Sequence, residues 1–395
     1  SDQAVNKLAS AKKSLSETVN LTMSGAFGYS GQITIGGQNF TTIFDTGSSD
    51  LWVPWVNCTE TACKKHRRFN ERLSKSFNHT YNGTMYYMGY GLMFFNVITA
   101  QDNLQVGDIE SVGQIFGLST YENFLFEDLQ FDGVFGMAFD DISTFGAATP
   151  FSNMINQKAI NEPYFSFYLQ RSKDDVGKLT LGGVDTTKFT GNLSYHKVAQ
   201  YNGSYKFWMT EMDDISINGK KLNYTNKKAI FDTGVPAILM PYYDADSFHK
   251  YVNGSYNQFT NYVSQVSFIF GGISYNINAS ELILQYDKDY HQCISGVQSA
   301  DISEDDTWVV DGRELDTEKG LDFEDDNIDL VFQKTDCSIR NGVVTHFQRE
   351  ERINLVLADV FLIVFDNIKK KIDKNFLALH KEIEKGNILD EAWSK

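Results

Sequence analysis

The amino-acid sequence predicts an all-β protein made of two lobes. Its composition combines 30 Phe, 20 Tyr and 30 Gly with only 5 Pro, which is typical of many short strands joined by tight turns. The chain has 395 residues, enough to build two hydrophobic cores. An Asp-Thr-Gly triplet occurs twice, at residues 45–47 and 232–234, each time directly after a short apolar run. Two copies in matching contexts, one per half, indicate an internal duplication.

The expected elements follow from alternation and from glycine breaks along the chain. Residues 28–35 alternate polar and apolar side chains and end on glycine, and residues 116–136 and 166–183 continue this pattern. Helices are expected only at residues 149–155 and 241–252, next to proline. We therefore expect a mostly antiparallel chain with few helices.

The two halves share a further feature. Each has an apolar run that ends in a turn containing Gly or Ala, at residues 131–136 and 354–359. This repeat also supports an internal duplication.

The paired triplets indicate a specific chemistry. Two strand-to-glycine turns that meet tip to tip would place the carboxylates of Asp45 and Asp232 side by side. Two carboxylates about 3 Å apart cannot both ionise, so they share one proton. The ionised member can then act as a general base on a water molecule, while the protonated member donates to a carbonyl oxygen. This arrangement suits hydrolysis of a peptide bond.

At this point the sequence resembles the pepsin-like aspartic proteases, the pepsin and cathepsin D family, from about Ser24 to Phe365. Residues 44–54, Phe-Asp-Thr-Gly-Ser-Ser-Asp-Leu-Trp-Val-Pro, match the family's first active-site loop almost residue for residue. Shorter matches to its strand motifs lie at 114–118, 131–134, 179–185 and 357–361. The resemblance implies a bilobal fold in which two β-lobes are joined by a central sheet, with the active-site cleft between them.

The implied domain organisation has an N-terminal lobe at residues 20–188, with the first triplet and the flap, and a C-terminal lobe at residues 189–395. Residues 1–19 lie upstream of the family's usual mature start. They are either a plain extension or a remnant of the basic prosegment that masks the dyad in zymogens. Relative to the family, an acidic stretch at about residues 299–350 is interpreted as an insertion, and the tail at 369–395 has no clear match.

The resemblance also implies residue roles. Asp45 and Asp232 would be the catalytic carboxylates, whose sharing of a proton is the known behaviour of this family's dyad. The supporting residues would be Thr46, Gly47, Ser48, Thr233 and Gly234. In the family the threonines cross-link the two loops, the glycines let backbone N–H groups approach the carboxylates, and the serine binds the outer oxygen of Asp45. No cofactor and no metal ion is implied.

The family closes a hairpin, the flap, over its substrate. Residues 87–94 align with it, so Tyr90 would be the flap tyrosine, Trp52 its hydrogen-bond partner, and Gly91 and Leu92 part of the tip. The alternative is that these tyrosines are ordinary strand residues of a half-buried hairpin.

Three apolar positions match the wall of the pocket that receives the substrate residue before the cut. They are Phe124, Phe131 and Val134. The alternative is that they belong to the ordinary core.

The second triplet departs from the family. Val235 and Pro236 follow it, where the family has a hydroxyl residue and a serine. Loss of a hydrogen bond to the charged form of Asp232 predicts a pH optimum that is shifted upward rather than a loss of activity.

Cysteines and sequons indicate a secretory route. Of the four Cys, Cys58 and Cys63 lie in one polar loop and are expected to pair, leaving Cys293 with Cys337. A zinc site at Cys58, Cys63 and His66 is a weaker interpretation, since it lacks a fourth ligand. Asn-x-Ser/Thr sequons, all candidate glycosylation sites, occur at Asn20, Asn39, Asn57, Asn78, Asn82, Asn192, Asn202, Asn223, Asn253 and Asn278.

Charge excludes some functions. Residues 301–329 hold thirteen acidic and two basic residues, and therefore carry −11 of the net charge of −16. A nucleic-acid surface is not expected. The stretch is either a solvated loop or an electrostatic gate. A calcium-binding loop of the EF-hand type is not expected here, because Thr307 and Val309 would occupy its first and third ligand positions. The longest apolar run, residues 353–365, contains Asp359, so no membrane span is expected.

Taken together, these features predict a secreted, lysosomal or vacuolar aspartic endopeptidase. It would act as a monomer on peptide or protein substrates, cut between hydrophobic residues at acidic to mildly acidic pH, and bind statine-type inhibitors. The competing hypothesis is a catalytically impaired pepsin-like glycoprotein that binds peptides or proteins.

Overall fold

The computed structural model describes most of the first 332 residues. The described ranges are 16–24, 28–90, 93–169, 176–188, 193–235, 237–251, 265–278, 282–287, 292–300, 307–311, 319–324 and 327–332. Most of the expected N-terminal extension and the whole divergent tail lie outside them.

The architecture is dominated by β-strands, as the sequence predicts. The largest sheet has 14 strands in the order β12-β25-β24-β10-β11-β1-β2-β3-β9-β4-β8-β7-β5, with β6 paired to β7. Its strands are β1 (Glu17–Met23), β2 (Tyr29–Ile35), β3 (Gln38–Asp45), β4 (Leu51–Pro54), β5 (Asn78–His79), β6 (Tyr86–Tyr90), β7 (Met93–Val106), β8 (Ile109–Glu122), β9 (Gly133–Gly136), β10 (Phe165–Tyr168), β11 (Gly177–Leu181), β12 (Ser194–Lys197), β24 (Lys319–Glu324) and β25 (Asn327–Phe332).

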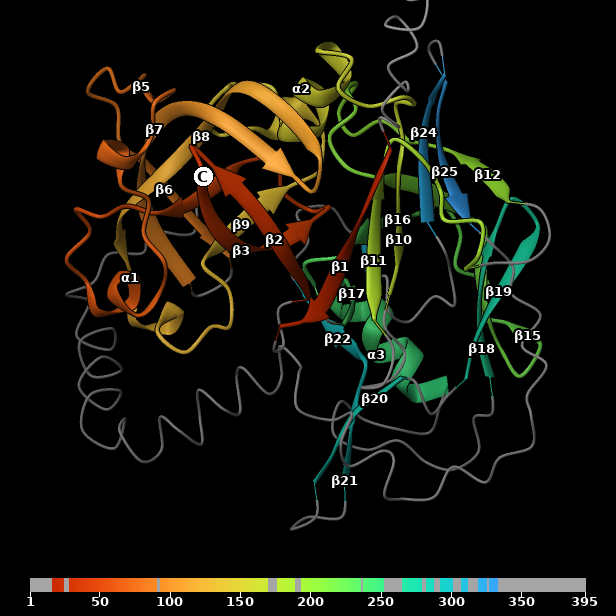
Figure 1. The fold of residues 1–395 in the computed structure, drawn as a ribbon. Helices are drawn as coiled ribbons and strands as arrows, with labels where there is room; N and C mark the ends of the chain where they lie inside the picture. Colours follow the sequence, from red (N-terminus) through yellow and green to blue (C-terminus); the bar gives the residue numbers. More distant parts are fainter. Residues whose placement is uncertain are drawn as a thin grey trace, which may run out of the picture.

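The second half forms three smaller sheets, ordered β13-β16-β23-β17-β22, β15-β14-β18-β19 and β20-β21. Their strands are β13 (Met209–Met212), β14 (Asp214–Ile217), β15 (Lys220–Lys221), β16 (Lys227–Asp232), β17 (Ile238–Met240), β18 (Gln265–Phe270), β19 (Ile273–Asn278), β20 (Ile283–Asp287), β21 (Gln292–Ser295), β22 (Val297–Ser299) and β23 (Thr307–Asp311). Figure 1 shows the red-to-gold strands of the first half beside the green-to-blue strands of the second, with β1, β10 and β11 between them. The predicted all-β bilobal fold is confirmed.

The two halves repeat one arrangement around their triplets. In the first half β3 runs parallel to β9, which is antiparallel to β4. In the second half β16 runs parallel to β23, which is antiparallel to β17. The strand beside the second triplet is therefore Thr307–Asp311, while the apolar run at residues 354–359 lies outside the described residues.

The acidic stretch is not simply a solvated loop. Three of its segments pair as strands: β23 with β16, β24 with β10, and β25 with both β24 and β12. The charge count conceals short apolar runs between the carboxylates, and the start of β23 shows the result, because Thr307, Trp308 and Val309 are buried. Burial of these side chains outweighs the local excess of charge.

Helices are few and short. The expected helices appear as α2 (Pro150–Asn156) and α3 (Tyr242–Tyr251), while α1 (Thr61–Lys65) was not foreseen. The start of α2 is set by Thr149, whose side chain accepts a bond from Ser152 N at 3.1 Å, and by proline at the first helical position. Three 3₁₀ turns complete the set: Glu71–Leu73, Phe124–Phe126 and Asp140–Ile142.

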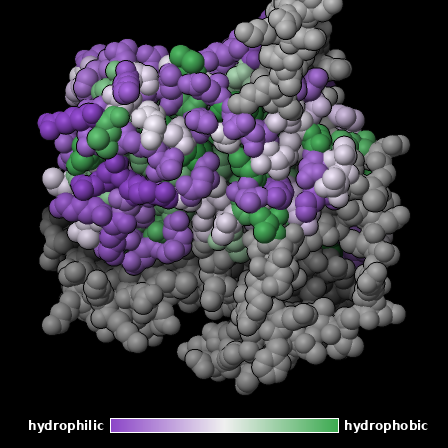
Figure 2. Space-filling view, in the orientation of Figure 1, coloured by the Kyte–Doolittle hydropathy of each residue, from purple (hydrophilic) through white to green (hydrophobic). Residues whose placement is uncertain are grey.

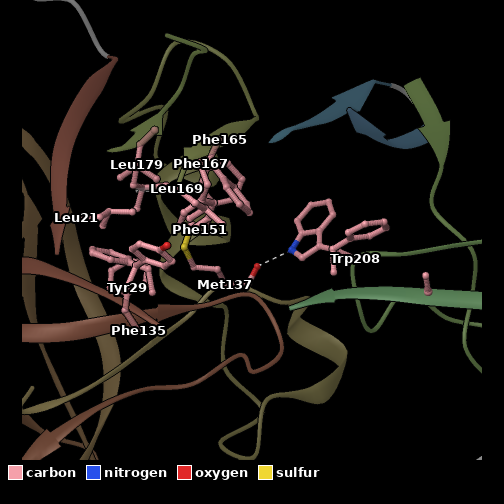
Figure 3. Close-up of a cluster of buried hydrophobic side chains, with 14 of the residues drawn as sticks. Leu21, Tyr29, Phe135, Met137, Phe151, Phe165, Phe167, Leu169, Leu179 and Trp208 are labelled. Carbon is pink, nitrogen blue, oxygen red and sulfur yellow. Dashed lines mark hydrogen bonds between the residues drawn. The ribbon is translucent and has the colours of Figure 1, made fainter. Parts of the chain in front are cut away.

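The main core runs from the first half into the second. Figure 3 shows Tyr29, Phe135, Phe151 and Phe165 packed together, with Trp208 reaching toward them from the second half. The Trp208 indole N–H donates to the carbonyl oxygen of Met137 at 2.8 Å, which fixes the two halves to each other. On the face drawn in Figure 2, hydrophilic side chains predominate over the first half.

Candidate active site

The two Asp-Thr-Gly turns meet and are cross-linked by their threonines. Thr46 Oγ1 donates to Phe231 O at 2.9 Å, and Thr233 Oγ1 donates to Phe44 O at 2.6 Å. Each hydroxyl also accepts a backbone N–H from the opposite turn, Thr46 N at 3.1 Å and Thr233 N at 2.9 Å. The result is a nearly symmetric set of four hydrogen bonds between residues that are 185 to 189 positions apart.

Glycine is required where the turns touch. A β-carbon at Gly47 would lie 2.1 Å from Asp232 Oδ2, and one at Gly234 would lie 2.4 Å from Asp45 Oδ1. A β-carbon at Gly234 would also lie 3.2 Å from Asp232 Oδ1. One oxygen of each carboxylate, here called its inner oxygen, therefore lies close to the same position. No side chain larger than hydrogen fits between the carboxylates and the opposing backbone.

Each aspartate is also bound by its own turn. Gly47 N donates to Asp45 Oδ1 at 2.9 Å, and Gly234 N donates to Asp232 Oδ1 at 2.8 Å. Asp45 also accepts a hydroxyl bond, because Ser48 Oγ donates to its Oδ2. At the equivalent place in the second turn, Val235 packs against a buried apolar cluster instead. The pair is therefore held asymmetrically.

The flap hairpin is formed by β6 and β7, and its tyrosine reaches the first turn. Trp52 Nε1 donates to Tyr90 Oη at 3.0 Å, and the Tyr90 hydroxyl also hydrogen-bonds the side chain of Ser48. A chain of hydrogen bonds thus runs from Trp52 through the flap tyrosine to Asp45. Burial, reinforced by the charge of Asp45, raises the pKa of Tyr90, so its hydroxyl stays protonated. Gly91 and Leu92 at the tip lie outside the described residues.

An aromatic cluster packs against the strands of the flap. Trp52 packs on Phe95 with ring centroids 4.2 Å apart and meets the edge of Phe126 at 5.7 Å. Phe131 and Val134, expected in the substrate pocket, are buried in this cluster. Phe124, the third expected pocket residue, is 61% exposed and takes no part in it.

Sequence reasoning missed Phe95 and Phe126. Phe126 follows Phe124 and Leu125 in a run of three apolar residues, and only the 3₁₀ turn decides which of the three points inward. Phe95 is one of several apolar residues in a long strand, where alternation alone leaves the inward face open.

The first cysteine pair forms the expected disulfide. Cys58 and Cys63 are bonded with their Cα atoms 6.1 Å apart, so neither thiolate is free for zinc. The ring nitrogens of His66 lie against Ala62 O and Leu129 O instead. The pairing of Cys293 with Cys337 stays a prediction, since Cys337 lies outside the described residues.

Most sequons that the structure describes are open to solvent. The exposed asparagines are Asn20, Asn39, Asn57, Asn78, Asn82, Asn202 and Asn223. Asn192 and Asn253 lie outside the described residues, and the side chain of Asn278 is not among those described. Exposure is the physical condition that a glycan requires.

We expect Thr233→Val to lower the free energy of unfolding by about 3 kcal/mol, because it leaves the buried Thr46 N and Phe44 O without this partner. Urea unfolding followed by tryptophan fluorescence measures the change. Thr42→Val is the matched control, because Thr42 is 0% exposed and its Oγ1 has no hydrogen-bond partner in the described part of the chain. Equal losses in the two variants would contradict the interpretation of the cross-link.

The described residues show neither a metal-binding cluster nor a membrane-spanning helix. They contain no group of three or more His, Cys, Asp or Glu side chains placed to hold a metal ion. Nor do they contain a helix of the length and apolarity needed to cross a membrane.

Comparison with known proteins agrees with this geometry. The model of the eukaryotic aspartyl protease family matches residues 28–313. The chain is 37% identical to pepsin II-2/3 of Oryctolagus cuniculus over 302 residues, which covers 71% of this chain and 74% of that protein. It is 35% identical to pepsin A of Rhinolophus ferrumequinum, covering 71% and 75% of the two chains. It is 34% identical to cathepsin E of Aquarana catesbeiana, covering 70% and 71%.

Proposed function

Since this chain belongs to the eukaryotic aspartyl protease family and is an aspartic endopeptidase, we propose that Asp45 and Asp232 are its catalytic pair and that it cuts between hydrophobic residues at acidic pH. The observation that carries the proposal is the contact between the two turns, where the inner oxygens of both carboxylates flank one point. The two carboxyl groups are therefore close enough to act together on one water molecule.

The mechanism follows from the shared proton. The ionised carboxylate removes a proton from the water as it attacks the scissile carbonyl carbon, and the protonated carboxylate donates to the carbonyl oxygen. The four threonine hydrogen bonds hold both turns in place, so the pair needs little rearrangement during the reaction. The flap tyrosine, held by Trp52, closes one side of the site.

The preference for hydrophobic residues rests on the cluster beside the dyad. Trp52, Phe126, Phe131 and Val134 form an apolar wall next to the turn that carries Asp45. An apolar substrate side chain seated against such a wall loses its contact with water, which favours binding by about 25 cal/mol per Å².

The direct test is a peptidase assay between pH 3 and 7 with peptides that have hydrophobic residues at the cleaved bond. We expect cleavage at the acid end and inhibition by a statine-type transition-state mimic. Absence of both cleavage and inhibitor binding across this range would support the alternative, a catalytically impaired pepsin-like protein that binds peptides.

Val235 supports a second prediction, on pH dependence. Val235→Thr supplies the hydroxyl that the second turn lacks, and a hydrogen bond to the charged form is worth about 1.5 kcal/mol or more. Because this bond favours ionisation, we expect the pH–rate profile to move about one pH unit toward acid. Val235→Ala, which changes the size of the side chain without adding a donor, is the control. An unmoved profile in Val235→Thr would show that the missing hydroxyl does not set the optimum.

The setting of the enzyme is proposed on sequence grounds as well. The disulfide and the exposed sequons fit a glycoprotein of the secretory route, either secreted or in an acidic lysosomal or vacuolar compartment. We propose that it acts as a monomer and is made as a zymogen. Native mass measurement of the secreted protein before and after acid treatment tests both proposals. The native mass gives the number of chains, and a fall in mass on acid treatment would show that a prosegment has been removed.

A further inference from the structure

A crevice of about 330 Å³ lies where the two halves of the molecule meet. The first half contributes Phe139, Asp140 and Asp141, and the second contributes Ser204, Tyr205 and Trp208. The volume falls at the lower end of the range typical of ligand sites. Trp208 is the same residue that reaches from the second half toward the core in Figure 3.

The lining of the crevice combines aromatic faces with negative charge. Phe139 packs on Trp208 at 4.3 Å and on Tyr205 at 6.1 Å between ring centroids, which gives one side of the crevice an apolar wall. Asp140 and Asp141 are exposed at the opening, and no Lys, Arg or His is among the described residues that line it. Aromatic faces and carboxylates both attract a cation.

These carboxylates have capacity for a ligand. Asp140 Oδ1 accepts a bond from Thr149 N at 2.8 Å, which fixes its position and leaves its other oxygen for a donor. The neighbouring Lys206 is not among the residues that line the crevice. Its ammonium nitrogen lies over the ring of Tyr201, 5.2 Å from the ring centre.

The crevice adjoins the catalytic turn. Ala138 N donates to Ser48 O at 2.9 Å, and Ser49 Oγ donates to Phe139 O at 2.5 Å. Met137 N donates to Asp45 O at 2.7 Å. The strip of chain that forms one wall is therefore hydrogen-bonded to the loop that carries the first aspartate.

We propose that this crevice binds the arginine or lysine side chain of a peptide substrate, so that the enzyme selects for a basic residue in addition to hydrophobic residues at the cleaved bond. The guanidinium or ammonium group lies between Asp140 and Asp141, and its alkyl stem packs on Phe139 and Tyr205. This inference rests on the proposed function for its effect on cleavage, but not for binding.

The binding experiment uses the Asp45→Asn variant, so it does not depend on turnover. Calorimetric titration at pH 6 compares a peptide that carries one arginine with the same peptide carrying citrulline, which has the same shape without the charge. We expect the arginine peptide to bind about tenfold more tightly, the effect of roughly one charge-assisted hydrogen bond. Adding Asp140→Asn and Asp141→Asn to this variant should remove the difference.

A matched control removes the same charge elsewhere. Asp108→Asn with Glu162→Gln eliminates two exposed carboxylates that do not line the crevice, and should keep the tenfold preference. If the Asp140 change disturbs folding through its bond to Thr149, Asp141→Asn alone should still reduce the preference. Equal affinity for both peptides in the starting variant, or a preference that survives the double change, would overturn the proposal.

The cleavage assay separates this proposal from the proposed function. With Asp45 intact, KM for the arginine substrate should be lower than for its citrulline partner, and Asp140→Asn with Asp141→Asn should remove this difference. Cleavage of neutral peptides without an arginine preference would sustain the protease and refute the crevice site. An arginine preference in binding without any cleavage would sustain the crevice site and refute the proposed protease function.

Discussion

Asp45→Asn is expected to lower kcat by about 10⁴-fold without unfolding the protein. The amide keeps the shape of the carboxylate and one acceptor oxygen, so Gly47 N can keep its acceptor, while the Ser48 hydroxyl can rotate to accept a bond from the new amide N–H. What it loses is the ability to share a proton with Asp232, and with it the acid and base roles. Steady-state hydrolysis of a peptide at acid pH, together with thermal unfolding of both proteins, measures the two parts of this prediction.

Asp50→Asn is the matched control for this change. Asp50 is also buried and lies in the same loop region, where it accepts bonds from Ser143 Oγ at 2.7 Å and Thr144 N at 2.8 Å. These bonds are structural, so we expect lower stability but retention of kcat in the folded protein. A comparable fall in kcat for both variants would mean that Asp45 acts through the fold and not through chemistry.

Glu122→Gln is expected to remove a large pH dependence of stability. Glu122 is 3% exposed at the end of β8, where Ser119 Oγ donates to its Oε1 at 2.5 Å. Burial raises the pKa of Glu122 to about 7, while His66 lowers it and Asp132 raises it further. The folded protein therefore holds this carboxyl group protonated at acid pH.

The sign of the effect follows from the raised pKa. An unfolded glutamate ionises near pH 4.5, whereas Glu122 in the folded protein ionises near pH 7. The free energy of unfolding is therefore highest below pH 4.5 and falls as the pH rises from 4.5 to about 7. The loss amounts to about 3 kcal/mol by pH 8. Glu122 faces Phe95 across β7 and β8, and Phe95 stacks on Tyr90, so the weakened region is the base of the flap.

Urea unfolding at intervals from pH 4 to 8 measures this dependence. The natural protein should lose stability across the window, and Glu122→Gln should not. Glu110→Gln, an exposed glutamate on the same strand, should behave like the natural protein. Parallel curves for the natural protein and Glu122→Gln would show that this side chain is not buried as a neutral acid.

Local sequence was enough for the elements that depend on neighbouring residues. The apolar run before the first triplet predicted the strand that carries Asp45, and the proline-headed segment at residues 149–155 predicted α2. The partnership of Tyr90 with Trp52 was predicted only through resemblance, because 38 residues separate them and nothing in the local pattern pairs them.

The errors arose where long-range pairing decides. The acidic run was expected to be a solvated loop or an electrostatic gate, because a charge count ignores the few apolar residues that a sheet can bury. The structure pairs its segments as β23, β24 and β25. The strand beside the second triplet, Thr307–Asp311, was not foreseen, since several apolar runs in that half fit the repeat and only sheet register distinguishes among them.

The sequence by itself determined the chemistry of this protein: two Asp-Thr-Gly turns after apolar strands, one in each half. Such turns depend on the backbone freedom of glycine and on short-range patterning, both of which can be read from neighbouring residues. Only the tertiary structure decided that Glu122 is buried, that Phe126 rather than Phe124 supports the flap, and that two carboxylates and four aromatic rings line one crevice. Burial and charge proximity depend on which distant segments meet, and the local sequence does not record those meetings.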